Sequence, residues 1–285
     1  MSAQTAKTTK HRPKWRKNGL LLALGILLSI VYVFPFYIIV LNSFKTQREF
    51  FENVLAMPTA LFTENYMRAF DALRYFQTIG NNLYITTGSL AGIVLFGSMA
   101  AWRITRTFEK KGIKLIYYVM IAGMLIPFMG IMLPFISWID TLGLMSKSGM
   151  WVIYTGFGSS MAMFLMSGFV HSIPKEIEEA AIIDGCNNFT LFFDIVMALL
   201  KPIILTVIFL NLIWIWNDYL MPSLILRQPG NQTLPLMIFQ FFGGQVRRWN
   251  LALAGLTLSI APVILFYILM QKHIIKGISD GAVKS

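Results

Sequence analysis

The chain has 285 residues, of which 56% are hydrophobic and only 13% are charged, and its mean hydropathy is +0.64. Because about a quarter of the residues in an average soluble domain are charged, this composition argues against a water-soluble fold and indicates an integral membrane protein. The net charge of +11 is large, but its positive residues flank apolar runs instead of forming one face, which argues against nucleic-acid binding.

Six apolar runs are long enough to cross a bilayer, whose hydrocarbon core of about 30 Å needs about 20 helical residues. One such run could be a buried core helix, but six in succession predict an all-α integral membrane protein with six transmembrane helices. The runs cover residues 19–41, 82–102, 115–138, 150–170, 202–220 and 251–271.

Lys and Arg residues are distributed unevenly between the two sides of these spans. Sixteen of the 24 lie on the side of both termini and eight on the other side. Because positive residues are retained in the cytoplasm, both termini are predicted to be cytoplasmic. Residues 1–18 are expected to be a basic cytoplasmic leader. The first run is longer than a typical apolar signal core and lacks a cleavage site, so it is not a cleavable signal peptide.

The longest outer segment, residues 42–81, holds four positive and four negative side chains. Its pattern fits short interfacial helices that form either a docking surface or a solvated cap. In the third run, Pro127 and Pro134 are expected to bend or unwind the helix beside a pathway, since freed backbone groups are tolerated where they line a cavity. Small residues are expected to let the fourth run pack closely on a neighbour: Gly156, Gly158, Ser159, Ser160, Ser167 and Gly168.

Catalytic signatures are missing from the sequence. The histidines His11, His171 and His273 are far apart, and no phosphate-binding GxxxxGK[ST] loop is present. The apolar runs carry no central charge of the kind that ion-coupled transporters use. Asp218 is expected to be interfacial, and the single Cys186 a small filler in a cytoplasmic loop.

The cytoplasmic loop 171–201 gathers acidic residues that would be costly inside a membrane. Five of the 13 acidic residues of the chain lie here: Glu176, Glu178, Glu179, Asp184 and Asp194. Three of these sit where the first turns of a helix would begin, at the positive end of its dipole.

The same loop carries the signals of a helix, a turn and a second helix. Ser172 is the expected N-cap, with Pro174 in the first turn. Gly185 can adopt the positive φ that ends a helix, and a second helix can begin near Asn188. Periodicity alone fits a projecting docking element and an ordinary capped loop equally well.

The segment "EEAAIIDG" (178–185) resembles the EAA signature of bacterial ABC importer permeases, the coupling helix that fits a cleft on the ATPase subunit. Three flanking segments are similar to those of the carbohydrate importers: "FTENYMRAF" (62–70), "WNDYLMPSLIL" (216–226) and the tail "KGISDGAVKS" (276–285). With its six spans, nearly the whole chain resembles the second permease of the maltose-type systems. One departure is that the family's Ile-x-Leu-Pro reads "IVMA" at 195–198, with Pro202 four residues later.

The resemblance implies a type I ABC importer permease fold, with a transmembrane domain over residues 19–275 and a cytoplasmic tail over 276–285. It implies that the chain takes up a sugar or oligosaccharide by alternating access, while ATP is hydrolysed elsewhere. The residues that the resemblance assigns to ATPase coupling are Glu178, Glu179, Ala180, Ala181, Asp184, Gly185, Gly281 and Ala282.

The resemblance also implies the partners. These are a homologous second permease in a heterodimer, two ABC ATPase subunits that use ATP and Mg, an extracytoplasmic sugar-binding protein and the lipid of a bacterial cytoplasmic membrane. No cofactor bound by this chain, and no nucleic acid, is expected. Two alternatives are an importer permease for a non-sugar solute and, from another class, a membrane enzyme or ion-coupled transporter.

The sugar pathway is expected where aromatic faces lie near amide groups. Aromatic residues at span ends are also common as interfacial belts, so each of these side chains has that second interpretation. The candidates are Trp138, Trp151, Tyr154, Asn211, Trp214 and Asn217.

Overall fold

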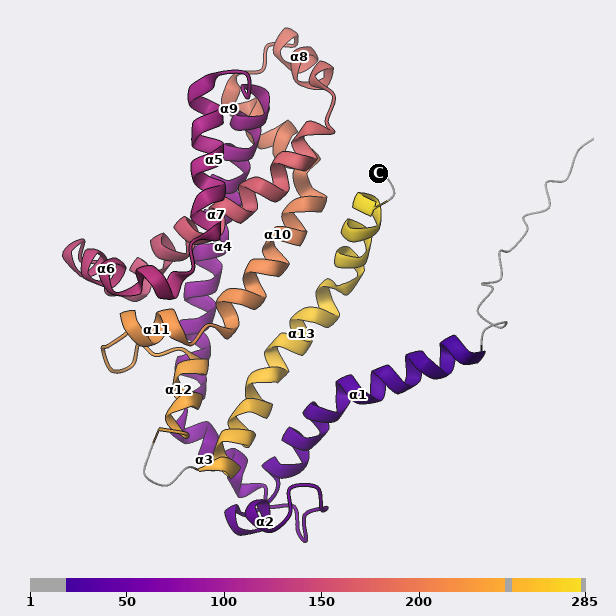
Figure 1. Ribbon diagram of the computed structural model, residues 1–285, viewed down its shortest axis with the longest axis vertical. Coiled ribbons are helices and arrows are strands. Elements are labelled where there is room, and N and C mark those ends of the chain that lie inside the picture. Colours follow the sequence, from indigo (N-terminus) through magenta and orange to yellow (C-terminus); the bar gives the residue numbers. More distant parts are fainter. Residues whose placement is uncertain (1–18, 244–247, 283–285) are drawn as a thin grey trace, which may run out of the picture.

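The structure, a computed structural model, describes residues 19–243 and 248–282, and the elements in those ranges are all helices (Figure 1). The all-α membrane fold predicted from the apolar runs is confirmed. In chain order the elements are α1 (Gly19–Ser43), α2 (Gln47–Glu52), α3 (Glu64–Ala72), α4 (Tyr75–Arg106), α5 (Lys111–Leu125), α6 (Phe128–Thr141), α7 (Lys147–His171), α8 (Lys175–Ile183), α9 (Asn188–Thr190), the π-helix η2 (Leu191–Val196), α10 (Met197–Asn217), α11 (Leu220–Ile225), α12 (Leu234–Gln240) and α13 (Trp249–Ala282).

All six predicted runs lie on helices. Four helical segments of the described residues are long and apolar enough to cross a membrane: α1, α4, α7 and the continuous stretch from α9 to α10. A fifth span results if α5 and α6, bent by 106° at their junction, are counted together. The sixth run lies in α13, whose described apolar part, Trp249–Leu265, is shorter.

The third run is broken at Pro127, as its proline predicts. Ile126 is extended, with φ −77° and ψ 116°, because a residue before proline is pushed out of the helical region. Pro127 itself is also extended, and α6 begins directly after it. The break is sharper than the expected bend, whereas Pro134 lies inside α6 without ending it.

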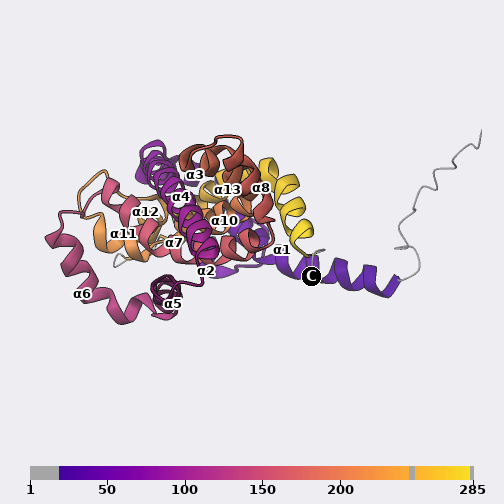
Figure 2. The ribbon, with the colours of Figure 1, turned by 90° about the horizontal axis from the view of Figure 1, so that it is seen from above.

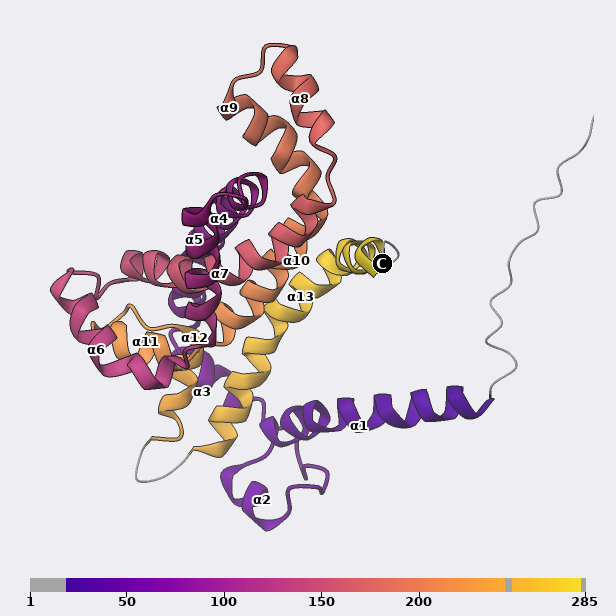
Figure 3. The same cartoon turned by 45° about the horizontal axis from the view of Figure 1, so that its top comes forward.

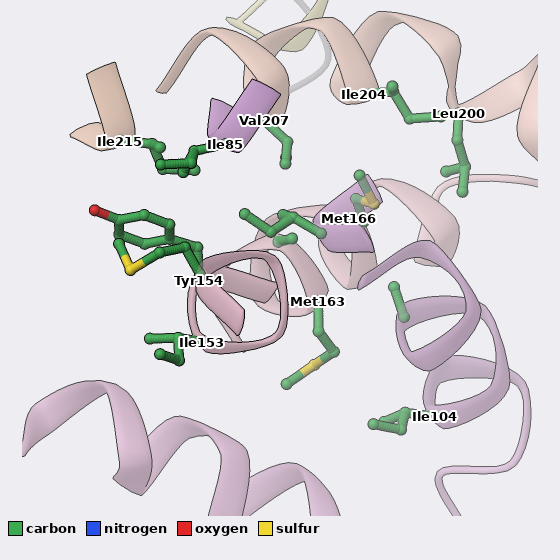
Figure 4. Close-up of a cluster of buried hydrophobic side chains, with 14 of the residues drawn as sticks. Ile85, Ile104, Ile153, Tyr154, Met163, Met166, Leu200, Ile204, Val207 and Ile215 are labelled. Atoms are coloured by element: carbon green, nitrogen blue, oxygen red, sulfur yellow. The ribbon is translucent and has the colours of Figure 1, made fainter. Parts of the chain in front are cut away.

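The core is built around α4 and α7, which lie side by side (Figures 1 and 3). Glycines on α4 allow this close approach, because a Cβ at Gly88, Gly92 or Gly97 would come within 2.6 Å or less of an α7 side chain. On α7 only Gly158 has such a role, against Ile93, while Gly156 and Gly168 face open space. The glycines that allow the close packing of α4 and α7 therefore lie mostly on α4. Figure 4 shows the apolar side chains that fill the space between α4, α7 and α10.

Helix α1 stands apart from this core, and the C-terminal end of α1 contacts α13 (Figures 1 and 2). Only 6% of the most apolar part of α1 is buried, compared with 39% for α7. Its apolar side chains are therefore left for lipid or for another chain.

The connecting segments gather at two opposite ends of the molecule. Helices α8 and α9 and the α4–α5 connection lie at one end, and α2, α3 and α12 lie at the other (Figures 1 and 3). This separation matches the two sides to which the charge distribution assigns these segments.

Candidate functional site

A helix–turn–helix projects from one end of the membrane domain (Figures 1 and 3). Its first helix, α8, begins after Pro174, which is its N-cap. Ser172 was the expected N-cap, but it ends α7 and donates its hydroxyl to the carbonyl of Phe169 at 2.8 Å. The correction arises because the residue before a proline is pushed out of the helical region, so a helix that started at Ser172 could not continue through residue 173, and α8 starts only after Pro174.

The turn after α8 has the geometry that the sequence predicts. Gly185 has a φ of +91°, in the region that side-chain-bearing residues rarely adopt. Its N–H donates to Ile182 O at 3.0 Å, and the N–H of Cys186 donates to Ala181 O at 3.0 Å. These two bonds form a Schellman motif, which satisfies the last carbonyl groups of α8. Asn187 then caps α9, which begins at residue 188 as expected.

The predicted coupling residues divide between the two sides of α8. Glu178 and Ala181 are buried and face the membrane domain. Four other coupling residues are exposed and face away from the membrane domain: Glu179, Ala180, Asp184 and Gly185. The exposed side therefore combines acidic groups with small side chains, which leave room for a partner.

Large apolar side chains surround that exposed side. Ile183 is 85% exposed, and Ile182 and Phe189 are more than half exposed. These residues lie outside the apolar spans, where lipid would not cover them. Large apolar side chains that are exposed close together in the sequence and outside the spans are typical of a protein–protein contact.

The buried Glu178 carboxylate holds α8 against α4. Arg106 donates to Oε1 through Nη2 at 2.6 Å and Nε at 2.8 Å, and Trp102 donates to Oε2 at 2.9 Å. Arg106 also donates to the carbonyl of Ile173, just before α8, at 3.0 Å. Neither Trp102 nor Arg106 was predicted as a functional residue, because in the sequence Arg106 counts only toward the positive charge beside the second span.

The π-helix η2 lies where the sequence departs from the family pattern. Its last residues and the start of α10 contain the segment 195–198, and Pro202 lies inside α10. The N–H of Met197 donates to Phe192 O, five residues back, which is the wider turn of a π-helix. The proline-free segment thus continues as helix.

A cavity of about 660 Å³ lies between the α5–α6 bend, α7 and α10. Its wall is mostly apolar and includes Phe128, Phe135 and Phe157. Three of the predicted pathway residues, Trp138, Asn211 and Trp214, line it. The cavity is large enough for a small ligand and offers aromatic faces beside Asn211, a largely buried amide whose N–H donates to the carbonyl of Val207 at 2.9 Å.

The other three predicted pathway residues do not line this cavity. Tyr154 is fully buried in the core (Figure 4) and donates its hydroxyl to Asp218 at 2.8 Å. Trp151 donates to the carbonyl of Tyr84 at 2.8 Å, and Asn217 donates to its own helix at Ile213 O. Besides this bond from Tyr154, Asp218 accepts a hydrogen bond at 2.9 Å from the N–H of Leu220, the first residue of α11. Its expected interfacial position stays a prediction.

The predicted tail residues Gly281 and Ala282 lie at the end of α13. Their side chains, and residues 283–285, lie outside the part of the structure that can be described. Their proposed contact with an ATPase therefore remains a prediction.

Within the described residues, no three His, Cys, Asp or Glu side chains gather where they could hold a metal ion. Cys186 is a half-buried free thiol that lies directly after the turn at Gly185. The candidate site therefore consists of a protein-contact surface and a cavity.

The opposite end is a hydrogen-bonded cap with an apolar rim. Lys45 is buried, donates to the carbonyls of Asn53 and Val54, and has its pKa lowered by burial. Hydrogen bonds from Thr59 and then Thr46 hold the pKa of Glu49 at about 2. Exposed on the rim are Phe51, Leu55, Met57, Leu61, Met67 and Phe76. Both earlier interpretations, a cap and a docking surface, fit this arrangement.

Comparison with known proteins adds the family context. Residues 93–280 match the family model described as binding-protein-dependent transport system inner membrane component. AmyC of Thermoanaerobacterium thermosulfurigenes, named as a probable starch degradation products transport system permease protein, is 43% identical over 93% of this chain and 96% of its own length. MsmG of Streptococcus mutans, a multiple sugar-binding transport system permease protein, is 32% identical over 90% of this chain and 93% of its own.

A solved structure shares the fold. The chain superimposes with a TM-score of 0.75 on a crystal structure of a bacterial ABC transporter involved in the import of the acidic polysaccharide alginate. The match covers 93% of this chain and 99% of that chain, at 21% sequence identity. At this identity the likeness shows the fold alone.

Proposed function

The chain belongs to the family of inner membrane components of binding-protein-dependent transport systems, and on this premise we propose that it is a permease subunit of an ATP-driven importer for a sugar or oligosaccharide. The observation that carries this proposal is the projecting α8, which ends in a Schellman turn and presents an exposed apolar and acidic surface outside the spans. Such a surface needs a partner, and a permease of this family needs a source of energy.

The partner at α8 is an ABC ATPase subunit, one of two in the assembly, which bind and hydrolyse ATP with Mg. This chain then binds no nucleotide or cofactor and catalyses no reaction. The end of the molecule that carries α8 faces the cytoplasm, and both termini lie on that side, in agreement with the excess of Lys and Arg there.

The solute is a sugar, and the cavity beside the α5–α6 bend is this chain's part of its pathway. Trp138 and Trp214 offer aromatic faces, and Asn211 offers an amide, which together suit the apolar faces and hydroxyl groups of a sugar ring. The names of the two relatives, which refer to starch degradation products and to multiple sugars, support the same class of solute.

Further partners complete the assembly. A homologous second permease packs against this chain and completes the pathway. An extracytoplasmic binding protein docks on the end opposite α8, near α2, α3 and α12. Binding protein and ATP both favour the outward-open state, because a ligand shifts an equilibrium only by its differential affinity for the two states. The exposed surface of α1 contacts lipid or the second permease.

Transport competition tests this proposal. Vesicles that carry the full assembly are loaded with ATP and supplied with binding protein and a labelled oligosaccharide, and unlabelled sugars compete. Inhibition of uptake by a subset of mono- or oligosaccharides is the expected result. Uptake that only amino acids, phosphate or peptides inhibit would instead identify a permease for another solute.

A further inference from the structure

Helix α4 is tied by side chains to α8 at one end. The Glu178 carboxylate accepts three hydrogen bonds from α4, two from Arg106 and one from Trp102. The Arg106 and Glu178 side chains are only 13% and 11% exposed. By contrast, the pairs Arg48–Glu52 and Arg68–Glu64 are exposed and join residues four apart on one helix. A buried pair with both acceptor oxygens occupied holds its two helices in one geometry, unlike a surface pair.

The other end of α4 is tied to the outer loop 226–233. Asn81 donates to the carbonyls of Gly230 at 2.8 Å and Gln232 at 2.9 Å, and it accepts from Lys147 of α7 at 2.9 Å. Asn82 accepts from the N–H of Leu234, the first residue of α12, at 2.9 Å. Both asparagines are buried, so their amides are committed to these partners.

Between the two sets of ties, α4 is continuous. It contains no proline and packs on α7 through Gly88, Gly92 and Gly97. Twenty residues separate Asn82 from Trp102, which is about 30 Å of helix and equals the thickness of a bilayer core. Helices α5 and α6 are bent by 106°, and the helical stretch that leads into α10 contains the wider turn η2. Helix α7 is also continuous, but its connection to α8 is the segment 172–174, whereas α4 holds the α8 side chain Glu178 directly.

We propose that α4 is the element that carries the movement of α8 across the membrane to the outer loop 226–233, with Arg106 and Trp102 as positioning residues for α8. The inference rests on the proposed function, because it takes α8 as the contact with the ATPase. Coupling between two sites is reciprocal, so a partner that docks on the outer loop changes the affinity of α8 for its own partner through the same helix. The three-residue linker between α7 and α8 then serves mainly as a connection.

The test uses a reporter on the outer loop. An environment-sensitive fluorophore is attached to Gln228→Cys, an exposed position, in a chain that also carries Cys186→Ser so that the native thiol is not labelled. The full assembly is placed in lipid nanodiscs, and ATP is added without sugar. In the double variant Arg106→Met/Glu178→Met, two side chains of similar length keep the apolar packing but lose the tie, and removal of both charges leaves neither buried alone. Glu176→Gln, an exposed acid on the same helix, is the matched control.

We expect the fluorescence response to ATP to fall about fivefold or more in the double variant, with ATPase subunits retained and the thermal midpoint near wild type. A purely structural role would lower the midpoint or the retention and leave the response per assembled complex unchanged. A wild-type response in the double variant would overturn the inference.

A second variant acts at the far end of α4. Asn81→Asp keeps an acceptor for Lys147 but cannot donate to Gly230 and Gln232, so it removes two of the hydrogen bonds that tie α4 to the outer loop without touching α8. The same loss of fluorescence response is expected in Asn81→Asp. If the double variant loses its ATPase subunits, the response of Asn81→Asp is the result that tests the inference. An unchanged response in Asn81→Asp, or no response to ATP in the wild type, contradicts the inference.

Failure of the proposed function gives a different result. In that case, no sugar-loaded binding protein stimulates hydrolysis by the wild-type assembly, while the label on the outer loop still responds to ATP.

Discussion

Glu178 and Glu179 are neighbours in the sequence but point to opposite sides of α8. Glu178 is 8% exposed and bound to Arg106, whereas Glu179 is exposed beside the protruding Ile182 and Ile183. The two acids therefore have different tasks: the first holds the helix to the membrane domain, and the second is available to a partner.

Replacement of Glu179 by Gln is expected to weaken binding of the ATPase subunits. The exposed carboxylate can make charge-assisted hydrogen bonds with a partner, and loss of such a bond costs about 1.5 to 3 kcal/mol. The affinity of the purified permease pair for ATPase subunits, measured at low and high salt, checks this. Glu176→Gln is the control, and equal affinities for the two variants would show that Glu179 makes no such contact.

Local chemistry made the coupling loop predictable. The positive φ of Gly185 and the helix that follows at residue 188 depend on nearby residues only, so the sequence alone could indicate them. The partner of Glu178 could not be found in this way, since Arg106 is 72 residues away and the pairing depends on how α4 and α8 pack.

Asn211 and Asn217 both lie on α10, but Asn211 is only 3% exposed, whereas Asn217 is exposed. Each donates its amide to the carbonyl four residues earlier, at 2.9 and 2.8 Å, but only Asn211 lines the cavity. Asn211→Ala is therefore expected to lower sugar uptake about fivefold, the value of one hydrogen bond of about 1 kcal/mol, while Asn217→Ala leaves uptake unchanged. Uptake rates in vesicles check this, and equal effects would place the sugar elsewhere.

Tyr154 and Trp151 show why the sequence alone could not define the pathway. Both have the aromatic character that sugar sites use, but packing turns Tyr154 toward Asp218 and Trp151 toward the backbone of Tyr84. The cavity itself depends on the break at Pro127. A proline in the sequence indicates that a helix bends, but it does not specify the angle, which is 106° here.

The outer cap is expected to depend on pH through Glu49. Its pKa is lowered from 4.5 to about 2 by hydrogen bonds from Thr59 and Thr46, so the stabilisation is fully present above about pH 4.5 and is lost as the pH falls toward 2. Glu49→Gln should therefore raise hydrogen exchange in residues 44–62 most at pH 7, with a smaller difference at pH 3.

The ratio of exchange rates between variant and wild type at each pH checks this, because the intrinsic pH dependence cancels. Glu52→Gln, which affects only an exposed pair with Arg48, is the control. A ratio that stays constant down to pH 3 would contradict the role of Glu49.

Deletion of residues 278–285 is expected to impair coupling without affecting membrane insertion. The reason is that this tail resembles the tail of the maltose-type permeases. Its small residues, such as Gly281 and Ala282, suit a narrow protein interface. Sugar-stimulated ATP hydrolysis by the assembly containing the truncated chain checks this. Stimulation at the wild-type level would mean that the tail is dispensable.

The most direct test of the central claim, that the turn after α8 couples the ATPase to the pathway, is ATP hydrolysis stimulated by sugar-loaded binding protein in an assembly with Gly185→Leu. A Cβ at Gly185 would meet nothing within 4 Å, so its cost comes from the φ of +91° alone, about 1 to 3 kcal/mol. Gly185→Asn, which tolerates this conformation better, and Gly168→Ala, in an open helical position, are the controls.

We expect Gly185→Leu to leave the spans inserted and the second permease bound. The variant should lose its ATPase subunits or their stimulation by sugar, with Gly185→Asn intermediate and Gly168→Ala like the wild type. Retention of ATPase subunits together with wild-type stimulation in Gly185→Leu would contradict the central claim and reduce α8 and its turn to a well-capped loop.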